Sequence, residues 1–353
     1  MKLFRPSNNN EITTLCLYHR VDMDGKCSGA IVNYLYKHVN KNSNIWFIGC
    51  NYEKDFSIDT ILETFPNLKA MYIVDYSIDP NDAIKVCSKG IDVVWCDHHK
   101  TAIEKYENHP GFKEDTALNE EDENIKSFCL NDKNIPSVFW GVTSYKYSGA
   151  KLVYKSLYPT LKLTVNPGIL STMEVVSNLV SIYDTWDHSD TEKWDLAYAF
   201  NNATRLYNLN PIEEKWDEIF EDIEVVKTML EEGNIVIRLT TLQNKITADA
   251  YSGTLEWEGL KFCTINRLGN SNLVNSTFNP EIHDAVLMFM YSPREGLYKV
   301  SMYSNDKLSE EAKAKLDLSS IALKYGGGGH KLACGFSCYD LPFNIHDIKP
   351  LVK

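Results

Sequence analysis

Acidic and histidine side chains follow the ends of several predicted strands in the first half of the sequence. Apolar runs at 13–18, 71–74 and 93–96 predict buried strands. The residues that follow these runs, or that end a later helical pattern, are His19, Asp22, Asp24, Asp75, Asp97, His98, His99 and Asp184. In an open parallel sheet the carboxyl ends of the strands meet at one edge, where ligands bind. We therefore expect these side chains to converge.

Converging carboxylates repel one another unless a cation neutralises them. The side chains offer oxygen and imidazole nitrogen but no thiolate, a mixture that suits Mn²⁺ and, less specifically, Mg²⁺ or Co²⁺. Two such ions about 3.5–4 Å apart can share a carboxylate, activate a water and stabilise charge on a phosphoryl group. The pattern thus predicts a hydrolytic site that holds two divalent metal ions.

The order of the predicted elements indicates an α/β protein with two domains. Strands and helices alternate through the first half, which predicts a mostly parallel sheet with helices on both faces. We place this catalytic domain at 1–205, a helical connector at 206–254 and a smaller C-terminal α/β domain at 255–353.

Four local expectations complete this outline. Residues 137–157 and 172–183 have helical spacing, with Pro159 and Pro167 in the gap between them. Residues 113–126 are acidic and predict a surface loop, and Gly233 predicts a break in the helical connector.

The overall composition limits the classes of function. The formal net charge is −12, whereas a protein that coats long duplex DNA needs a basic face. A short single-stranded oligonucleotide or a dinucleotide requires only a few local cations and stays compatible. Nine cysteines without CxxC spacing predict reduced, buried thiols. The sequence has neither an apolar leader at its start nor a run of about 18 apolar residues, which predicts a cytoplasmic protein without membrane contact.

These motifs resemble those of a known family. The triplet Asp97-His98-His99, the turn Asp22-Met23-Asp24-Gly25, Asp75 and Asp184 are similar to the four motifs of the DHH phosphoesterase superfamily. The segment Tyr325–His330, followed by Ala333-Cys334-Gly335-Phe336, is similar to the glycine-rich signature of the accessory domain called DHHA1. The strings around His98 and Asp184 most resemble the oligoribonuclease (nanoRNase) branch. The resemblance implies a DHH domain followed by a DHHA1 domain.

The resemblance also implies a set of metal ligands, position by position. His19, Asp22 and Asp75 would hold one ion. The second ion would be held by Asp24, Asp75, His98 and Asp184, with Asp75 as the bridge. Asp97 and His99 would act beside the metals, orienting ligands and contacting phosphate.

The C-terminal domain is expected to bind substrate. Gly326, Gly327, Gly328 and Gly329 let the backbone approach a phosphate with its N–H groups, and His330 can donate to the same anion. In the family, a strand with serine and arginine faces this loop. Here the strand contains Ser301 and Tyr303, so a tyrosine that can stack on a base replaces the arginine. Arg267 is a further candidate for substrate contact.

The leading functional hypothesis is hydrolysis of short RNA or DNA oligonucleotides to mononucleotides by a metal-dependent phosphodiesterase. The alternative is a phosphodiesterase of cyclic or linear dinucleotides, which the same site would serve. A lesser alternative is a catalytically silent module that binds nucleic acid. A homodimer is left open.

Overall fold

The computed structural model describes residues 11–40, 44–52, 57–115, 122–269 and 271–351. The chain divides into two compact units, Met1–Val236 and Ile237–Lys353. The boundary lies inside the long helix α9 (Ile223–Tyr251), within the region predicted as a connector. Each unit is described by itself below.

The first unit contains a seven-stranded sheet in the order β2-β1-β3-β4-β7-β6-β5. Its strands are β1 (Thr14–His19), β2 (Ile45–Cys50), β3 (Ala70–Val74), β4 (Asp92–Asp97), β5 (Phe112–Glu114), β6 (Lys126–Leu130) and β7 (Phe139–Thr143). The five strands from β2 to β7 are parallel, and β6 and β5 continue the sheet in antiparallel pairing. The prediction of a mostly parallel sheet is confirmed.

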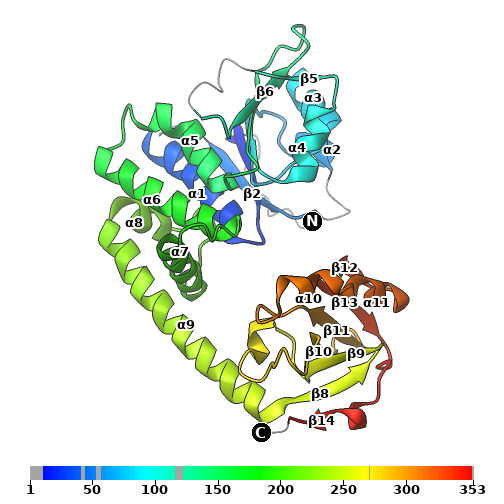
Figure 1. Ribbon diagram of the computed structural model, residues 1–353. Coiled ribbons are helices and arrows are strands. Elements are labelled where there is room, and N and C mark those ends of the chain that lie inside the picture. The colour runs from blue at the N-terminus through cyan, green and yellow to red at the C-terminus, as the bar shows by residue number, and fades with distance from the viewer. Residues whose placement is uncertain (1–10, 41–43, 53–56, 116–121, 270, 352–353) are drawn as a thin grey trace. The chain divides into compact units, whose positions relative to one another are not determined.

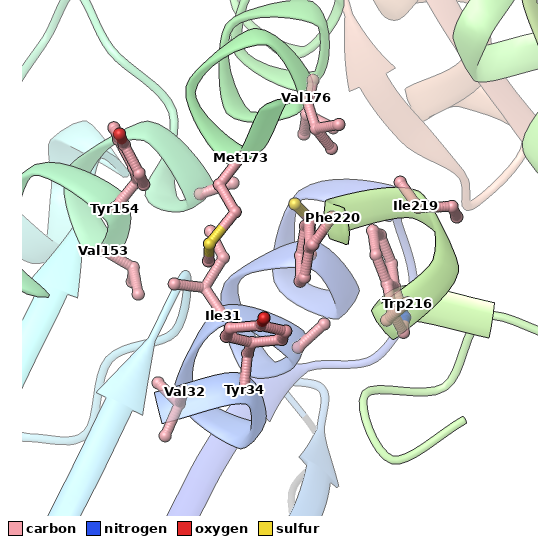
Figure 2. Packing of buried hydrophobic residues seen from close by; sticks show 14 of the residues in the cluster. Ile31, Val32, Tyr34, Val153, Tyr154, Met173, Val176, Trp216, Ile219 and Phe220 are labelled. Carbon is pink, nitrogen blue, oxygen red and sulfur yellow. The ribbon is translucent and has the colours of Figure 1, made fainter. Parts of the chain in front are cut away.

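Helices cover both faces of this sheet (Figure 1). They are α1 (Met23–His38), α2 (Ile58–Thr64), α3 (Pro80–Ser88), α4 (Lys100–Glu107), α5 (Gly149–Leu161), α6 (Pro167–Asp184), α7 (Thr191–Ala203), α8 (Lys215–Glu221) and the start of α9. One core joins the sheet to α2, α3 and α4 through residues such as Ile61, Val86 and Tyr106. The other core packs α1 against α5, α6 and α8, as Ile31, Met173 and Phe220 show in Figure 2. Burial on both faces explains why the strands read as continuous apolar runs.

Several local expectations are wrong. Residues 137–157 are not one helix, because Phe139–Thr143 pair with β4 as strand β7 and helix α5 begins only at Gly149. Pro159 lies inside α5, and Pro167 occupies the first turn of α6, where a missing N–H costs nothing. The connector has no break at Gly233, since α9 runs through it.

The role of Gly233 is close packing. A Cβ at this position would lie 1.9 Å from the carbonyl oxygen of Ala199 in α7. The predicted loop at 113–126 is bounded by the paired strands β5 and β6, and residues 116–121 lie outside the described part. None of the described helices has the length and apolar character needed to cross a membrane.

The second unit contains another seven-stranded sheet, in the order β12-β13-β11-β10-β9-β8-β14. The elements, which follow the end of α9, are β8 (Ser252–Trp257), β9 (Leu260–Ile265), β10 (Ala285–Ser292), β11 (Leu297–Tyr303), α10 (Glu310–Lys315), α11 (Leu318–Lys324), β12 (Gly328–His330), β13 (Ala333–Cys338) and β14 (Lys349–Pro350). Only the β9–β10 pair is parallel. Leu318 and Ile321 of α11 pack on the sheet with Phe262 and Phe336.

Candidate metal centre

The ends of three neighbouring parallel strands position most of the predicted ligands. His19 ends β1, Asp75 follows β3 directly, and Asp97 ends β4. These strands are adjacent in the order β1-β3-β4, so their carboxyl ends share one edge of the sheet. Asp22 caps α1 by accepting a hydrogen bond from the backbone N–H of Gly25 (3.1 Å). The fold therefore fixes the backbone position of each of these residues.

The first group of ligand atoms comes from His19, Asp22 and Asp75. The Nδ1 atom of His19 lies 2.8 Å from Oδ2 of Asp22 and 3.5 Å from Oδ2 of Asp75. One ligand atom from each of the three residues lies within 4.8 Å of the others. This is the trio expected for the first ion.

The second group surrounds His98. Its Nε2 atom lies 3.3 Å from Oδ1 of Asp75, 3.3 Å from Oδ2 of Asp184 and 3.6 Å from Oδ2 of Asp24. Asp75 thus turns one carboxylate oxygen toward His19 and the other toward His98. The structure brings together every residue that the sequence predicted as a ligand.

Asp75 provides the test of whether a cation fits here. Its side chain is 1% exposed, and neither of its oxygens accepts a hydrogen bond from the described residues. Burial, followed by the nearby charge of Asp24, raises the pKa of Asp75 well above its ordinary value. A buried carboxylate without donors is costly, and divalent cations that bind both oxygens would remove that cost. The donor set therefore fits metal ions.

The backbone of Asp75 is also unusual. Its φ angle is +49°, in the left-handed region that residues other than glycine rarely adopt. The amide N–H of Asp75 donates to the carbonyl oxygen of Cys96 at the end of β4 (2.8 Å). The neighbouring strand thus holds the residue in a conformation that it would not favour alone, which is common at functional sites.

The start of α5 fixes the carboxylate of Asp24. Its oxygens accept hydrogen bonds from the hydroxyl of Ser148 (2.6 Å) and from the backbone N–H groups of Gly149 (2.7 Å) and Ala150 (2.8 Å). The N-terminus of a helix favours negative charge. A Cβ atom at Gly149 would lie 2.6 Å from Cβ of Asp75, so only glycine lets the helix start come this close to the ligands.

Asp97 holds His99 rather than facing the ligand groups. The buried carboxylate accepts from the hydroxyl of Ser77, from the backbone amides of His98 and His99 and from Nδ1 of His99 (2.7 Å). Burial opposes ionisation, but the hydrogen bond from His99 and its companions keep the pKa of Asp97 below its ordinary value. The same hydrogen bond raises the pKa of His99. Asp97 therefore orients the imidazole of His99 beside the candidate metal ligands and favours its protonation.

The electrostatics of the centre reflect an excess of acidic groups. Burial and the charge of Asp24 raise the pKa of Asp184 to about 7. The nearby carboxylates of Asp22 and Asp75 raise the pKa of His19 to about 10. Despite burial, the hydrogen bond from His19 holds the pKa of Asp22 below its ordinary value. The imidazoles partly neutralise the carboxylates, and added cations would complete the neutralisation.

Sequence reasoning missed a tyrosine at this site. The ring of Tyr52 lies 6.0 Å from the rings of His19 and His99 and 5.1 Å from that of Tyr76. Tyr52 follows the end of β2 by two residues, and β2 is the neighbour of β1. The rule that strand ends converge would have found it. Ser77 and Ser148 were also missed, because isolated serines carry no spacing signal.

Five of the substrate residues predicted in the second unit lie on its sheet: Ser301, Tyr303, Gly328, Gly329 and His330. Ser301 of β11 pairs with Gly335 of β13, which pairs with Gly328 of β12. Two residues away in β13, Ala333 pairs with Tyr303 of β11 on one side and with His330 of β12 on the other.

The glycine run is therefore partly a loop and partly the edge strand β12. Gly326 and Gly329 have φ angles of +75° and +132°, and a Cβ at Gly327 would meet the carbonyl oxygen of Gly335 at 2.1 Å. Arg267 lies past the end of β9 and donates to the hydroxyl of Thr247 in α9 (3.3 Å). The described contacts do not bring Arg267 to the glycine run.

Comparison with known proteins supports the resemblance in the sequence. No protein-family model matches this chain. A curated relative, oligoribonuclease NrnB of Bacillus subtilis (strain 168), is 24% identical over 352 residues, which span 93% of this chain and 74% of the relative. The motifs and this relative together support a resemblance to DHH-family phosphoesterases.

The comparison with solved structures also found matches. The pGpG-specific phosphodiesterase PggH of Vibrio cholerae is 14% identical, with a TM-score of 0.45 and 93% of each chain covered. RecJ of Thermus thermophilus, in complex with Mn²⁺, is 13% identical, with a TM-score of 0.40, and the match covers 92% of this chain and 49% of RecJ. Both TM-scores are below 0.5, so the resemblance to the DHH family rests on the motifs and the curated relative.

Proposed function

We propose that this chain is a DHH-family enzyme that hydrolyses short oligonucleotides to mononucleotides. The reaction would use two divalent metal ions, and Mn²⁺ would be the preferred metal. The position of Asp75 carries the proposal, because its two buried oxygens face two separate ligand groups. The mixture of imidazole and carboxylate ligands suits Mn²⁺. The curated relative is named an oligoribonuclease, which supports a short nucleic acid as the substrate.

The residues of the candidate metal centre would have different roles in the reaction. His19, Asp22 and Asp75 would hold one ion, and Asp24, Asp75, His98 and Asp184 the other. When bound, the ions supply Lewis-acid stabilisation of the phosphate and lower the pKa of a water. His99, whose Nδ1 donates to Asp97, can present its other ring nitrogen to a phosphate oxygen. The hydrogen bonds that Asp24 and Asp97 accept hold both carboxylates in place, so neither side chain has to reorient during turnover.

The second unit would select the substrate by its terminal phosphate. At Gly326 and Gly328 nothing lies within 4 Å of the position of a Cβ atom, so the backbone there is open to a ligand, and His330 is exposed nearby. Tyr303 occupies the same row as His330 and offers an aromatic face. We propose that these residues contact the end of the oligonucleotide, which would favour substrates of a few nucleotides.

The substitution Asp75→Asn tests the catalytic proposal. Wild type should bind about two Mn²⁺ per chain and degrade RNA of two to ten nucleotides. Asp75→Asn should lose at least about a hundredfold in rate, since even residues behind the ligands cost that much in metal sites, and should lose bound Mn²⁺. The control Asp59→Asn changes an exposed aspartate on α2 whose ion pair with Lys85 adds little. Mn²⁺-dependent hydrolysis by Asp75→Asn at the wild-type rate would refute the proposal.

The same assay separates the competing substrates. Matching DNA, cyclic dinucleotides and linear dinucleotides should be compared with the RNA series under identical Mn²⁺ concentrations. Faster turnover of cyclic dinucleotides than of any linear RNA would replace the oligonucleotide assignment with the alternative one. Oligonucleotide binding by wild type without hydrolysis, in the presence of Mn²⁺, would favour a silent binding module.

A further inference from the structure

A partly exposed aromatic cluster flanks Asp184, at the turn between α6 and α7. It consists of Tyr183, Trp186, His188, Trp194 and Tyr198. Trp194 is the centre: its ring lies 4.9 Å from that of Trp186, 3.8 Å from that of His188 and 5.8 Å from that of Tyr183, with the last pair nearly parallel at 9°. Tyr198 extends the stack at 6.0 Å. Trp186 is 63% exposed, so most of its surface is open to a ligand.

The backbone shows that packing alone does not account for Trp186. Its φ angle is +55°. Its N–H donates to the carbonyl oxygen of Tyr183 (3.3 Å), and the next N–H, of Asp187, donates to that of Ile182 (3.0 Å). This pair of hydrogen bonds closes α6 in the way that usually places glycine at the left-handed position. A tryptophan there strains the backbone and buries little surface, which points to a role outside the fold.

The cluster is tied to the candidate metal centre by the chain itself. Asp184 reaches His98 at 3.3 Å, and Trp186 is only two residues further on. Consecutive Cα atoms are about 3.8 Å apart, so the Cα atoms of Asp184 and Trp186 lie within about 7.6 Å of each other. A phosphate and the base of the same nucleotide are separated by a comparable distance.

We propose that the aromatic cluster is a nucleobase subsite, with the indole of Trp186 stacking on a base next to the scissile phosphate. This inference rests on the proposed phosphodiesterase function. Aromatic stacking is tolerant of base identity, because every base has a π face. Stacking also requires no cation, which suits a chain whose net charge is −12. The subsite would therefore hold any nucleotide in position without a basic surface.

The test compares Trp186→Gly and Trp186→Phe with wild type in the full-length chain. The substrates are a 5′-phosphorylated dinucleotide and two versions in which one base or the other is replaced by an abasic residue. Trp186→Gly should raise KM for the intact dinucleotide about tenfold, as expected for loss of one stacked base, and Trp186→Phe should raise it less. One of the two abasic substrates should have the same KM with wild type and with Trp186→Gly.

Two further readouts exclude a merely structural role. Trp186→Gly relieves the positive φ angle, so its melting temperature should equal or exceed that of wild type. Its Mn²⁺ content and its kcat should match those of wild type. An equal rise in KM for all three substrates, or no rise for any, would overturn the stacking proposal.

Failure of the proposed function has a different signature. If wild type hydrolyses none of these dinucleotides with Mn²⁺, the phosphodiesterase proposal fails. Calorimetric binding of the same dinucleotides then decides the subsite. Weaker binding by Trp186→Gly of the intact dinucleotide and of the abasic version that keeps the stacked base supports it, and unchanged binding refutes it.

Discussion

The two units place their candidate functional residues differently. In the first unit, Asp24, Asp75 and Asp97 are at most 1% exposed, and the fold determines where each carboxylate lies. In the second unit, Gly329 and His330 are exposed on an edge strand of the sheet. Burial fixes the positions of the carboxylates, as catalysis requires, whereas a ligand can reach groups on an exposed edge strand. The contrast agrees with the proposal that the first unit carries the reaction and the second recognises the substrate.

Histidines show the same contrast. His19 and His99 lie beside carboxylates that raise their pKa values. His283 of the second unit is 2% exposed, and burial lowers its pKa although Asp284 opposes the effect. Its Nδ1 accepts from the backbone N–H of Asn279 (3.1 Å), so Nε2 carries the proton and donates to Thr254 (2.9 Å). His19 and His99 thus lie beside carboxylates that favour their protonation, whereas His283 is held neutral in the core of the second unit.

The largest expected effect comes from crowding the buried carboxylates. Gly149→Ala would place a Cβ 2.6 Å from Cβ of Asp75 and 3.0 Å from Oδ2 of Asp24. We expect the rate to fall at least about a hundredfold, since displacements of about 1 Å in a catalytic site have that cost. Mn²⁺-dependent hydrolysis and Mn²⁺ content measure the change.

Gly168→Ala is the matched control in the same unit. This glycine lies in the first turn of α6, and its added Cβ would meet only the side-chain oxygen of Asn166 at 3.2 Å. Alanine favours a helix over glycine, so activity and stability should stay at or above the wild-type level. Comparable losses for both variants would show that the first unit does not depend on the close approach at Gly149.

A smaller effect is expected at the exposed edge of the second unit. His330→Ala should raise KM about tenfold, because a hydrogen bond to a charged group contributes about 1.5–3 kcal/mol, and should leave kcat and Mn²⁺ content unchanged. His346→Ala, the same replacement at another exposed histidine of this unit, should change neither constant. Loss of bound Mn²⁺ in His330→Ala would abolish the division of roles between the units.

The smallest effect concerns the dependence of stability on pH. His283 has a lowered pKa in the folded state, so above the unfolded value of about 6.5 it is neutral in both states. Below about pH 6.5 only the unfolded state takes up the proton, and the free energy of unfolding decreases by at most about 1.4 kcal/mol per pH unit. Urea unfolding of the full chain at pH 7.5 and 5.5 should show this decrease.

His283→Gln serves as the reference for this measurement, because other histidines titrate in the same range. The variant should lose less stability than wild type between the two pH values, even if it is less stable at both. Equal losses would mean that His283 is protonated in the folded chain and that the contrast between the histidines of the two units is incorrect.

The metal ligands were predictable because two simple signals coincide. Apolar runs locate the parallel strands, and the parallel arrangement brings the strand-end residues His19, Asp75 and Asp97 to one edge. The left-handed backbone of Asp75 and the helix start that holds Asp24 were not predictable. Both depend on contacts between segments far apart in the sequence, such as the hydrogen bond from Ala150 to Asp24.

The errors in the fold have equally local causes. The run Phe139–Thr143 contains Gly141 and lacks strict alternation, so its spacing also fits a helix, and pairing with β4 decides for a strand. Gly233 breaks helical propensity, but the close approach of Ala199 uses the missing side chain. Tertiary contacts outweigh local preference in both cases.

The left-handed conformation of Asp75 has a consequence for engineering. Glycine would relieve the backbone at φ +49° and remove a buried carboxylate without hydrogen-bond donors. A directed-evolution screen for heat resistance of the metal-free chain should therefore enrich Asp75→Gly among its first survivors. A variant selected in this way would lack the carboxylate of Asp75 and would lose the proposed activity. Any such library therefore has to be screened for turnover in parallel.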